Sequence, residues 1–124
     1  MNANEALVAD FCEAWSRRDV DEILAFFAED AVYHNMPIDP VSGHDGIRSI
    51  LDMFVPVSQT IRFEVRNVAS AGDVVFTERV DRFEMGERTV ELPVAGVFEL
   101  RDGKIAAWRD YFDLGTWMRQ AGDG

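Results

Sequence analysis

The chain has 124 residues, 48% of them apolar, and a formal net charge of −11. This length is typical of one domain, and such a chain buries roughly two thirds of the surface that its unfolded form exposes. The negative charge disfavours nucleic acid and anionic lipid as partners, because both bind to concentrated basic surfaces. We therefore expect residues 1–124 to form one domain that binds neither nucleic acid nor a membrane.

The first half of the chain shows the spacing of helices. Apolar residues at i, i+4, i+7 and i+8 predict a first helix over 6–15. Asp19 is a capping residue for a second helix, whose buried stripe extends to Phe27. A third helix is expected over 47–54, after a glycine-rich turn at 43–46.

Beyond residue 60 the apolar residues alternate with polar ones, which is the period of a strand. The expected strands, separated by turn signals, cover 61–66, 73–84, 89–101 and 104–112. Consecutive strands joined by short turns form antiparallel hairpins. Helices followed by such strands indicate an α+β domain, with the helices packed on one face of a curved sheet.

Several kinds of chemistry are not expected. No run approaches the roughly 20 apolar residues that span a bilayer, and no charged leader precedes an apolar stretch, so we expect a cytoplasmic protein. The single cysteine, Cys12, has helix-like neighbours and is expected to be a buried, inert thiol. His34 and His44 have no neighbour at the spacing of metal ligands, and we predict no metal site.

Strand alternation singles out three charged residues by the neighbours that share their faces. Arg79 and Asp81 share a face of the 73–84 strand, and same-face neighbours about 7 Å apart can form an ion pair. Asp110 shares the face of Trp108 and Phe112 in the last strand. A carboxylate between aromatic rings is costly to bury without a partner, so Asp110 requires one.

Two further polar side chains, Tyr33 and Asn35, share one face of a short alternating stretch over 31–35. Each residue also has a purely structural interpretation. Arg79 and Asp81 could form a surface ion pair, Asp110 could be a charge at a strand edge, and Asn35 could form a turn. Their occurrence together is what indicates a catalytic site.

Five segments of the chain carry a recognisable pattern: Ala28-Glu29-Asp30, Tyr33-His34-Asn35-Met36-Pro37, Thr77-Glu78-Arg79-Val80-Asp81, Gly96-Val97-Phe98 and the stretch 102–113. The most specific parts are Tyr-x-Asn-Met-Pro, Arg-x-Asp and Trp-Arg-Asp-Tyr-Phe, in this order and spacing. With these segments the chain resembles the limonene epoxide hydrolase family over most of its length. The resemblance implies a cone-shaped, nuclear transport factor 2-like α+β fold. In this fold a curved mixed sheet carries the N-terminal helices on its concave face and encloses a deep pocket, commonly in a homodimer.

The resemblance also assigns roles to the five polar residues. Asp110 corresponds to the base that activates water, Tyr33 and Asn35 hold that water, Asp81 protonates the epoxide oxygen, and Arg79 links the two carboxylates. The substrates implied are water and a small lipophilic or cyclic epoxide, the product is a vicinal diol, and no cofactor is needed. The side chains expected to line the substrate pocket are Trp108, Phe112, Met36, Phe83 and Leu92.

These residue types suit the reaction. Opening an epoxide with water needs a base for the water and an acid for the departing oxygen, and two aspartates can divide that work. If both were ionised, their cluster with Arg79 would carry one negative charge in an apolar pocket, so burial favours a single shared proton. This requires desolvation and mutual repulsion to outweigh the pull of Arg79 on either pKa.

Two other functions are compatible with the same fold. A ketosteroid isomerase or polyketide cyclase uses an aspartate to move protons at carbon, with a protonated acid holding the oxyanion. Arg79 disfavours this function, because a cation beside both acids weakens a carbon base. The other alternative is a module that binds a small molecule, or dimerises, without chemistry.

Overall fold

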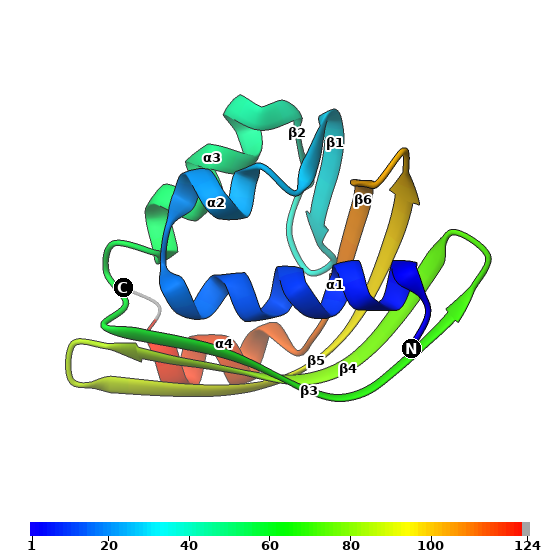
Figure 1. Ribbon diagram of the computed structural model, residues 1–124. Helices are drawn as coiled ribbons and strands as arrows, with labels where there is room; N and C mark the ends of the chain where they lie inside the picture. Colours follow the sequence, from blue (N-terminus) through cyan, green and yellow to red (C-terminus); the bar gives the residue numbers. More distant parts are fainter. Residues whose placement is uncertain (123–124) are drawn as a thin grey trace.

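The computed structural model describes residues 1–122, and the last two residues of the expected domain, Asp123 and Gly124, lie outside the described residues. The elements, in chain order, are α1 (Ala3–Ala14), a 3-10 helix (Trp15–Arg17), α2 (Val20–Leu24), β1 (Phe27–Asn35), β2 (Val41–Ser42), α3 (Gly43–Phe54), β3 (Thr60–Ala71), β4 (Val74–Met85), β5 (Arg88–Arg101), β6 (Lys104–Tyr111) and α4 (Leu114–Ala121). A six-stranded sheet curves around the helices, with α1 lying across its hollow and α2 and α3 beyond it (Figure 1). The expected α+β class is confirmed.

The sheet has the strand order β2-β1-β6-β5-β4-β3. Strands β3 to β6 form the expected antiparallel hairpins, whereas β1 runs parallel to β6, so the sheet is mixed. The parallel register pairs Tyr33 with Trp108 and Asn35 with Asp110. It therefore brings the polar residues of the first strand beside those of the last.

The first three helices follow the expected order, with differences at their ends. Asp19 caps α2 as predicted and accepts a hydrogen bond from the Glu22 N–H at 3.2 Å. The prediction that the buried stripe of the second helix extends to Phe27 is wrong, because Phe27 pairs with Ile105 and begins β1. Helix α3 begins at Gly43, so the expected turn at 43–46 is its first turn.

The alternation of residues along a strand correctly groups the residues of one face of β4, but it does not hold at the start of β6. Every second residue of β4 on this face is buried: Val75, Thr77, Arg79, Asp81 and Phe83. In β6, Ile105 is buried, whereas Ala106, which strict alternation would put on the face of Trp108 and Asp110, is only half-buried. The pairing with β5 shifts by one residue between Ile105 and Ala107, and this bulge reverses the alternation.

The sequence did not predict helix α4. Asp113 caps it and accepts a hydrogen bond from the Thr116 N–H at 2.9 Å. The helix packs on β5, where the Gln120 amide oxygen accepts from the Glu91 N–H at 2.5 Å. None of its residues is fully buried, and its eight residues include a glycine, Gly115, in the first turn, which lowers the helix propensity of the segment.

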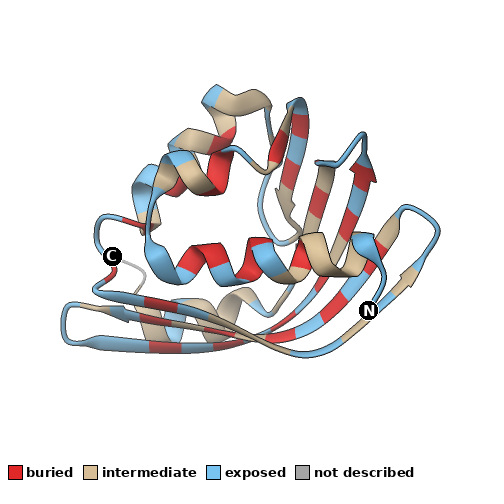
Figure 2. Cartoon of the chain, in the orientation of Figure 1, coloured by how far each residue is buried: buried red, intermediate tan, exposed pale blue. Residues whose placement is uncertain are grey.

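The core lies between α1 and the concave face of the sheet, where the buried segments of both face each other (Figure 2). Trp108 is at its centre and has no solvent exposure. Its ring stacks on Tyr33, with centroids 4.2 Å apart and an interplanar angle of 8°, and on Phe98 at 5.5 Å. These stacks hold β1, β5 and β6 in place beside the polar site. Within residues 1–122, no helix is long and apolar enough to cross a bilayer.

Candidate active site

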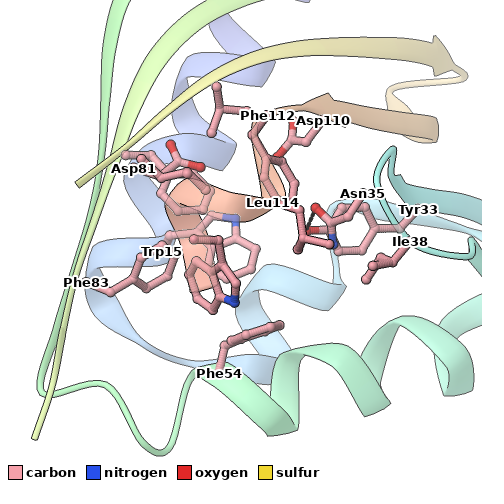
Figure 3. Close-up of a pocket in the computed structure, with 14 residues that line it drawn as sticks. Trp15, Tyr33, Asn35, Ile38, Phe54, Asp81, Phe83, Asp110, Phe112 and Leu114 are labelled. Atoms are coloured by element: carbon pink, nitrogen blue, oxygen red, sulfur yellow. Dashed lines mark hydrogen bonds between the residues drawn. The ribbon is translucent and has the colours of Figure 1, made fainter. Parts of the chain in front are cut away.

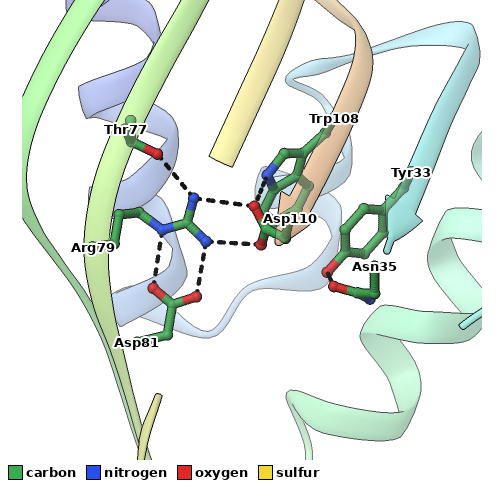
Figure 4. A network of polar contacts seen from close by, with 7 residues as sticks. All are labelled: Tyr33, Asn35, Thr77, Arg79, Asp81, Trp108 and Asp110. Carbon is green, nitrogen blue, oxygen red and sulfur yellow. Dashed lines mark hydrogen bonds and ion pairs between the residues drawn. The ribbon is translucent and has the colours of Figure 1, made fainter. Parts of the chain in front are cut away.

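The guanidinium of Arg79 holds both candidate aspartates (Figure 4). Toward Asp81, its Nε donates to Oδ1 at 3.0 Å and its Nη2 to Oδ2 at 2.9 Å. Toward Asp110, Nη1 donates to Oδ1 at 3.2 Å and Nη2 to Oδ2 at 2.7 Å. The remaining N–H, on Nη1, donates to the Thr77 hydroxyl at 3.1 Å, so all five N–H donors of the arginine are used.

This cluster is buried as a unit. The Arg79 side chain has no solvent exposure, and those of Asp81 and Asp110 are 6% and 5% exposed. The guanidinium carbon also lies 5.1 Å from the centre of the Phe63 ring and 5.8 Å from that of Trp108. With both acids ionised, the cluster carries one net negative charge in a mostly aromatic environment, which is costly unless it takes up a proton.

The pKa of Asp110 reflects that cost. Burial raises the pKa of Asp110 from 3.8 to about 6, although the charge of Arg79 acts in the opposite direction and the charge of Asp81 adds to the rise. Desolvation and the charge of Asp81 together thus outweigh the pull of the arginine. Because one guanidinium binds both carboxylates, a single proton makes the whole cluster neutral and belongs to the pair.

Asp110 has one donor that Asp81 lacks. The indole Nε1 of Trp108 donates to Asp110 Oδ1 at 2.6 Å. Asp110 therefore accepts three hydrogen bonds, while Asp81 accepts two, both from Arg79. Additional donors stabilise the anionic form of a carboxylate, so the hydrogen bond from Trp108 lowers the pKa of Asp110 against the larger effect of burial.

Tyr33 and Asn35 lie beside the cluster and contact each other. The Tyr33 hydroxyl donates to Asn35 Oδ1 at 3.0 Å, which leaves the Asn35 amide N–H groups and the lone pairs of the Tyr33 oxygen for another molecule. Burial raises the pKa of the Tyr33 phenol, which keeps it a neutral hydroxyl. Both residues line the same cavity as the two aspartates.

The cavity has a polar end and aromatic walls (Figure 3). Its polar lining consists of Tyr33, Asn35, Asp81 and Asp110. Its other residues are Trp15, Ile38, Phe54, Phe63, Phe83, Leu92, Val94, Phe112, Leu114 and Trp117. A few convergent polar groups in an apolar cleft are typical of a site for a small lipophilic ligand.

The expected pocket residues divide into two groups. Phe83, Leu92 and Phe112 line the cavity as expected, but Met36 and Trp108 do not. Trp108 lies behind Asp110 in the core, where it acts as a hydrogen-bond donor and not as a wall. Met36 begins the turn after β1, and its N–H is bound to the Asp110 carbonyl at 2.9 Å, so Ile38 of the same turn lines the cavity instead.

Gly96 is a site residue that sequence reasoning did not identify. It lies on β5, paired with Thr77 on one side and Asp110 on the other. A Cβ atom at this position would lie 2.8 Å from Asp110 Oδ1 and 2.9 Å from Thr77 Oγ1, and it would overlap Arg79 Nη1. The available signal was a glycine inside a strand, which often marks a close approach of other groups.

The other groups that could be reactive, the Cys12 thiol and the two histidine rings, lie in environments typical of structural residues. Burial raises the pKa of the Cys12 thiol to about 12, so it stays protonated, as expected for an inert cysteine. The His34 ring is hydrogen-bonded to the Ile38 carbonyl at 2.9 Å and the His44 ring to that of Phe27 at 3.0 Å. Among residues 1–122, no three histidine, cysteine or acidic side chains are grouped as a metal site.

Comparison with known proteins assigns the chain to a family. A model of the limonene-1,2-epoxide hydrolase catalytic domain matches residues 2–122. Epoxide hydrolase EphG of Mycobacterium tuberculosis is 34% identical over 109 residues, which cover 86% of this chain and 71% of that protein. A solved structure of an LEH-like epoxide hydrolase from M. tuberculosis has a TM-score of 0.78 at 30% identity, covering 94% of this chain and 86% of that one.

Proteins outside this family share the fold. A SnoaL-like polyketide cyclase from Shewanella putrefaciens superimposes with a TM-score of 0.85 over 98% of this chain and 97% of its own, at 16% identity. That similarity concerns the fold alone, whereas the family match extends over nearly the whole sequence. The chain therefore belongs to the limonene-1,2-epoxide hydrolase family of epoxide hydrolases.

Proposed function

We propose that this epoxide hydrolase adds water to a small lipophilic or cyclic epoxide in one concerted acid–base step and releases a vicinal diol. The observation that carries the proposal is the double contact of Arg79, whose Nη2 lies 2.9 Å from Asp81 and 2.7 Å from Asp110 at the polar end of the cavity. It places an acid and a base on one cation, facing one apolar space.

Asp110, Asn35 and Tyr33 provide the hydrogen bonds that would orient the attacking water. The water donates one proton to Asp110 and one to the Tyr33 oxygen, and it accepts a hydrogen bond from the Asn35 amide. Its remaining lone pair then points at a carbon of the epoxide, and fixing this orientation in advance lowers the barrier. The parallel register of β1 and β6, which pairs Asn35 with Asp110, supports this arrangement.

Asp81 supplies the proton for the leaving oxygen. As the water attacks, Asp110 takes one of its protons, the carbon–oxygen bond of the ring breaks, and Asp81 protonates the released oxygen. The cluster starts with Asp81 protonated and ends with Asp110 protonated, so Arg79 stays paired with one carboxylate throughout. Return of the proton to Asp81 completes the cycle without a covalent intermediate.

A reaction at carbon, as in a ketosteroid isomerase, suits this site less well. Such an enzyme needs a strong carbon base beside a protonated acid, and here one guanidinium binds both groups with charge-assisted hydrogen bonds.

We also keep the homodimer as a prediction, which analytical ultracentrifugation of the purified protein would test.

The proposal is tested by incubating the enzyme with limonene-1,2-epoxide and with cyclohexene oxide in oxygen-18 water. We expect diol formation, a single enantiomer in excess on chiral chromatography, and label in the diol during the first turnover. Label that enters the diol only after several turnovers would indicate an ester with the protein and would overturn the concerted step.

Variants of both aspartates complete this test. Asp81→Asn and Asp110→Asn should each abolish turnover while the protein stays folded, and Asp52→Asn, the same change at an exposed position of α3, should not. Retained diol formation in either of the first two variants would refute the proposal. Conversion of a β,γ-unsaturated ketone to its conjugated isomer, with no epoxide opening, would establish the isomerase alternative.

A further inference from the structure

One buried polar atom of the cavity residues lies outside the Arg79 cluster and has no hydrogen-bond partner among residues 1–122. The indole Nε1 of Trp15 is buried and has no hydrogen-bond acceptor among residues 1–122. It is the only buried side-chain nitrogen or oxygen of the described residues in this condition, and the residue is 2% exposed. A buried donor without an acceptor loses its hydrogen bonds to water without replacement, so such groups in native proteins call for an explanation.

Trp15 lines the same cavity as the two aspartates. Figure 3 shows it on the side of Phe83, with Asn35 and Ile38 on the opposite side. Its ring stacks on Phe63, with centroids 4.7 Å apart and planes inclined by 24°. The side chain is therefore held rigidly in the wall of the cavity that the two aspartates also line.

The protein around Trp15 offers no alternative acceptor. Its other ring neighbours are Phe11, with centroids 6.2 Å apart, and Trp108 at 5.9 Å, both edge-on. Aromatic rings have no oxygen or nitrogen lone pair to accept a conventional hydrogen bond. An ordered water is also disfavoured, because a buried water needs two to four polar partners and this wall provides one.

We propose that Trp15 determines substrate specificity by donating its indole N–H to a neutral oxygen of the substrate, remote from the epoxide ring. The substrate class is then an oxygenated lipophilic epoxide, which carries a carbonyl, hydroxyl or ether oxygen, and not a pure hydrocarbon epoxide. A carboxylate is excluded as the acceptor, because the cavity already contains two acids and one cation. This inference rests on the proposed function and adds to it the nature of the substrate.

The physical basis is the difference between a satisfied and an unsatisfied donor. An epoxide with the oxygen makes a hydrogen bond worth about 1 kcal/mol, which corresponds to roughly a fivefold to tenfold preference, and a hydrocarbon analogue leaves the N–H unpaired. Because Trp15 is not among the groups that exchange protons, the bond should be present in the ground state and in the transition state alike. The preference should therefore reside in KM and not in kcat.

A matched pair of substrates tests this directly. Limonene-1,2-epoxide carries an isopropenyl group, and its methyl ketone analogue carries an acetyl group of nearly the same shape, with oxygen in place of the terminal CH2. We expect kcat/KM to be roughly tenfold higher for the ketone, through a lower KM. In Trp15→Phe, which keeps an aromatic ring and removes the N–H, the ratio of the two kcat/KM values should approach one.

Trp117→Phe is the matched control, because Trp117 is a second, partly exposed indole of the same cavity. It should keep the preference for the ketone. Equal kcat/KM values of the two epoxides with the unmodified enzyme, or a ratio that persists in Trp15→Phe, would overturn the inference while leaving the hydrolase function intact. Absence of diol from both epoxides would instead contradict the function itself.

A binding measurement separates the inference from catalysis and from any folding defect of Trp15→Phe. In Asp110→Asn, which should not turn over, the ketone epoxide should bind more tightly than limonene-1,2-epoxide in calorimetry. It should also move the indole proton resonance of Trp15 downfield in the 15N–1H spectrum. If the two epoxides bind equally and neither moves this resonance, Trp15 is not a substrate contact.

Discussion

Arg79 reaches Asp110 across an intervening strand: Arg79 is on β4, Asp110 on β6, and their closest atoms, Nη2 and Oδ2, are 2.7 Å apart over β5. Strands in a sheet lie about 4.8 Å apart, so a residue of β5 with a side chain would occupy this path. Gly96 is the residue of β5 at the crossing, paired with Asp110. The contact of Arg79 with Asp110 therefore depends on the absence of a side chain at Gly96.

Gly96→Ala should inactivate the enzyme without changing any polar residue. The added Cβ overlaps Arg79 Nη1 and lies 2.8 Å from Asp110 Oδ1, and the guanidinium has no room to retreat because it is fully buried. A displacement of about 1 Å at reacting groups can cost on the order of a hundredfold in rate, so we expect kcat to fall by about that factor. Overpacking should also lower the free energy of unfolding by about 1–3 kcal/mol.

Steady-state kinetics and urea denaturation measure the two effects. Gly46→Ala is the control, because a Cβ there would meet the Val41 side chain at an ordinary 3.4 Å. A Gly96→Ala enzyme with the kcat of the parent would show that the guanidinium tolerates displacement, contrary to the geometry.

Tyr33→Phe should reduce turnover without disturbing the fold. The substitution keeps the ring that stacks on Trp108 at 4.2 Å and removes only the hydroxyl that donates to Asn35 Oδ1. Without it, the Asn35 amide is free to rotate and the attacking water loses a partner, so kcat should fall by about tenfold to a hundredfold.

The matched control for this variant is Tyr111→Phe, at the other tyrosine of the chain, which is 45% exposed. It should leave both kcat and the thermal unfolding midpoint at the values of the parent protein. If Tyr33→Phe retains full kcat, the hydroxyl has no part in positioning the water.

Local patterns in the sequence indicate the members of the Arg79–Asp81–Asp110 cluster, and only the family resemblance implies that Arg79 links the two acids. Alternation in β4 correctly places Arg79 and Asp81 on one face, which the structure buries, and the aromatic neighbours of Asp110 correctly indicate a buried acid that needs a partner. Their contact depends on which strand lies between β4 and β6, and on what that strand carries. No local pattern contains this information, so the role of Gly96 required the sheet order.

Other features were missed because local patterns are interrupted there or do not carry the information. The bulge in β6 reverses the alternation at Ile105, and a one-residue shift is invisible in a single strand. Helix α4 buries no residue completely, although its Trp117 helps to close the cavity. The unpaired N–H of Trp15 could not be predicted, because a tryptophan on a helical apolar stripe has the same sequence signature whether or not its nitrogen finds a partner.

Arg79→Met should destabilise the protein more at high pH than at low pH. Removing the arginine leaves Asp81 and Asp110 buried and unpaired, with side-chain exposures of 6% and 5%, and breaking a buried ion pair costs about 3–5 kcal/mol. At low pH both acids can protonate, so most of this loss should be recovered. Urea denaturation at pH 8 and pH 5 measures it, and an equal loss at both pH values would show that the arginine acts by packing and not by charge.

The pKa of Asp110 predicts linked effects of pH on stability and on catalysis. Burial raises this pKa from 3.8 to about 6, so the folded state binds the proton more tightly than the unfolded state does. Stability from this group therefore increases as the pH falls through about 6 and is complete below about 4, with a total of about 3 kcal/mol. In Asp110→Asn this contribution disappears, so the difference in unfolding free energy between the variant and the parent should change in that pH range and be constant above pH 7.

The same proton is required for catalysis, because the proposed reaction needs one carboxyl group of the pair protonated and the other ionised. The kcat/KM of the free enzyme should therefore fall as the pH rises above about 6, tenfold per pH unit once the cluster has lost its proton. Rates of diol formation between pH 5 and pH 9, corrected for spontaneous hydrolysis, measure this slope. A kcat/KM that rises through the same interval would mean that Asp110 acts as a base without a protonated partner, and that the epoxide oxygen receives its proton from another donor.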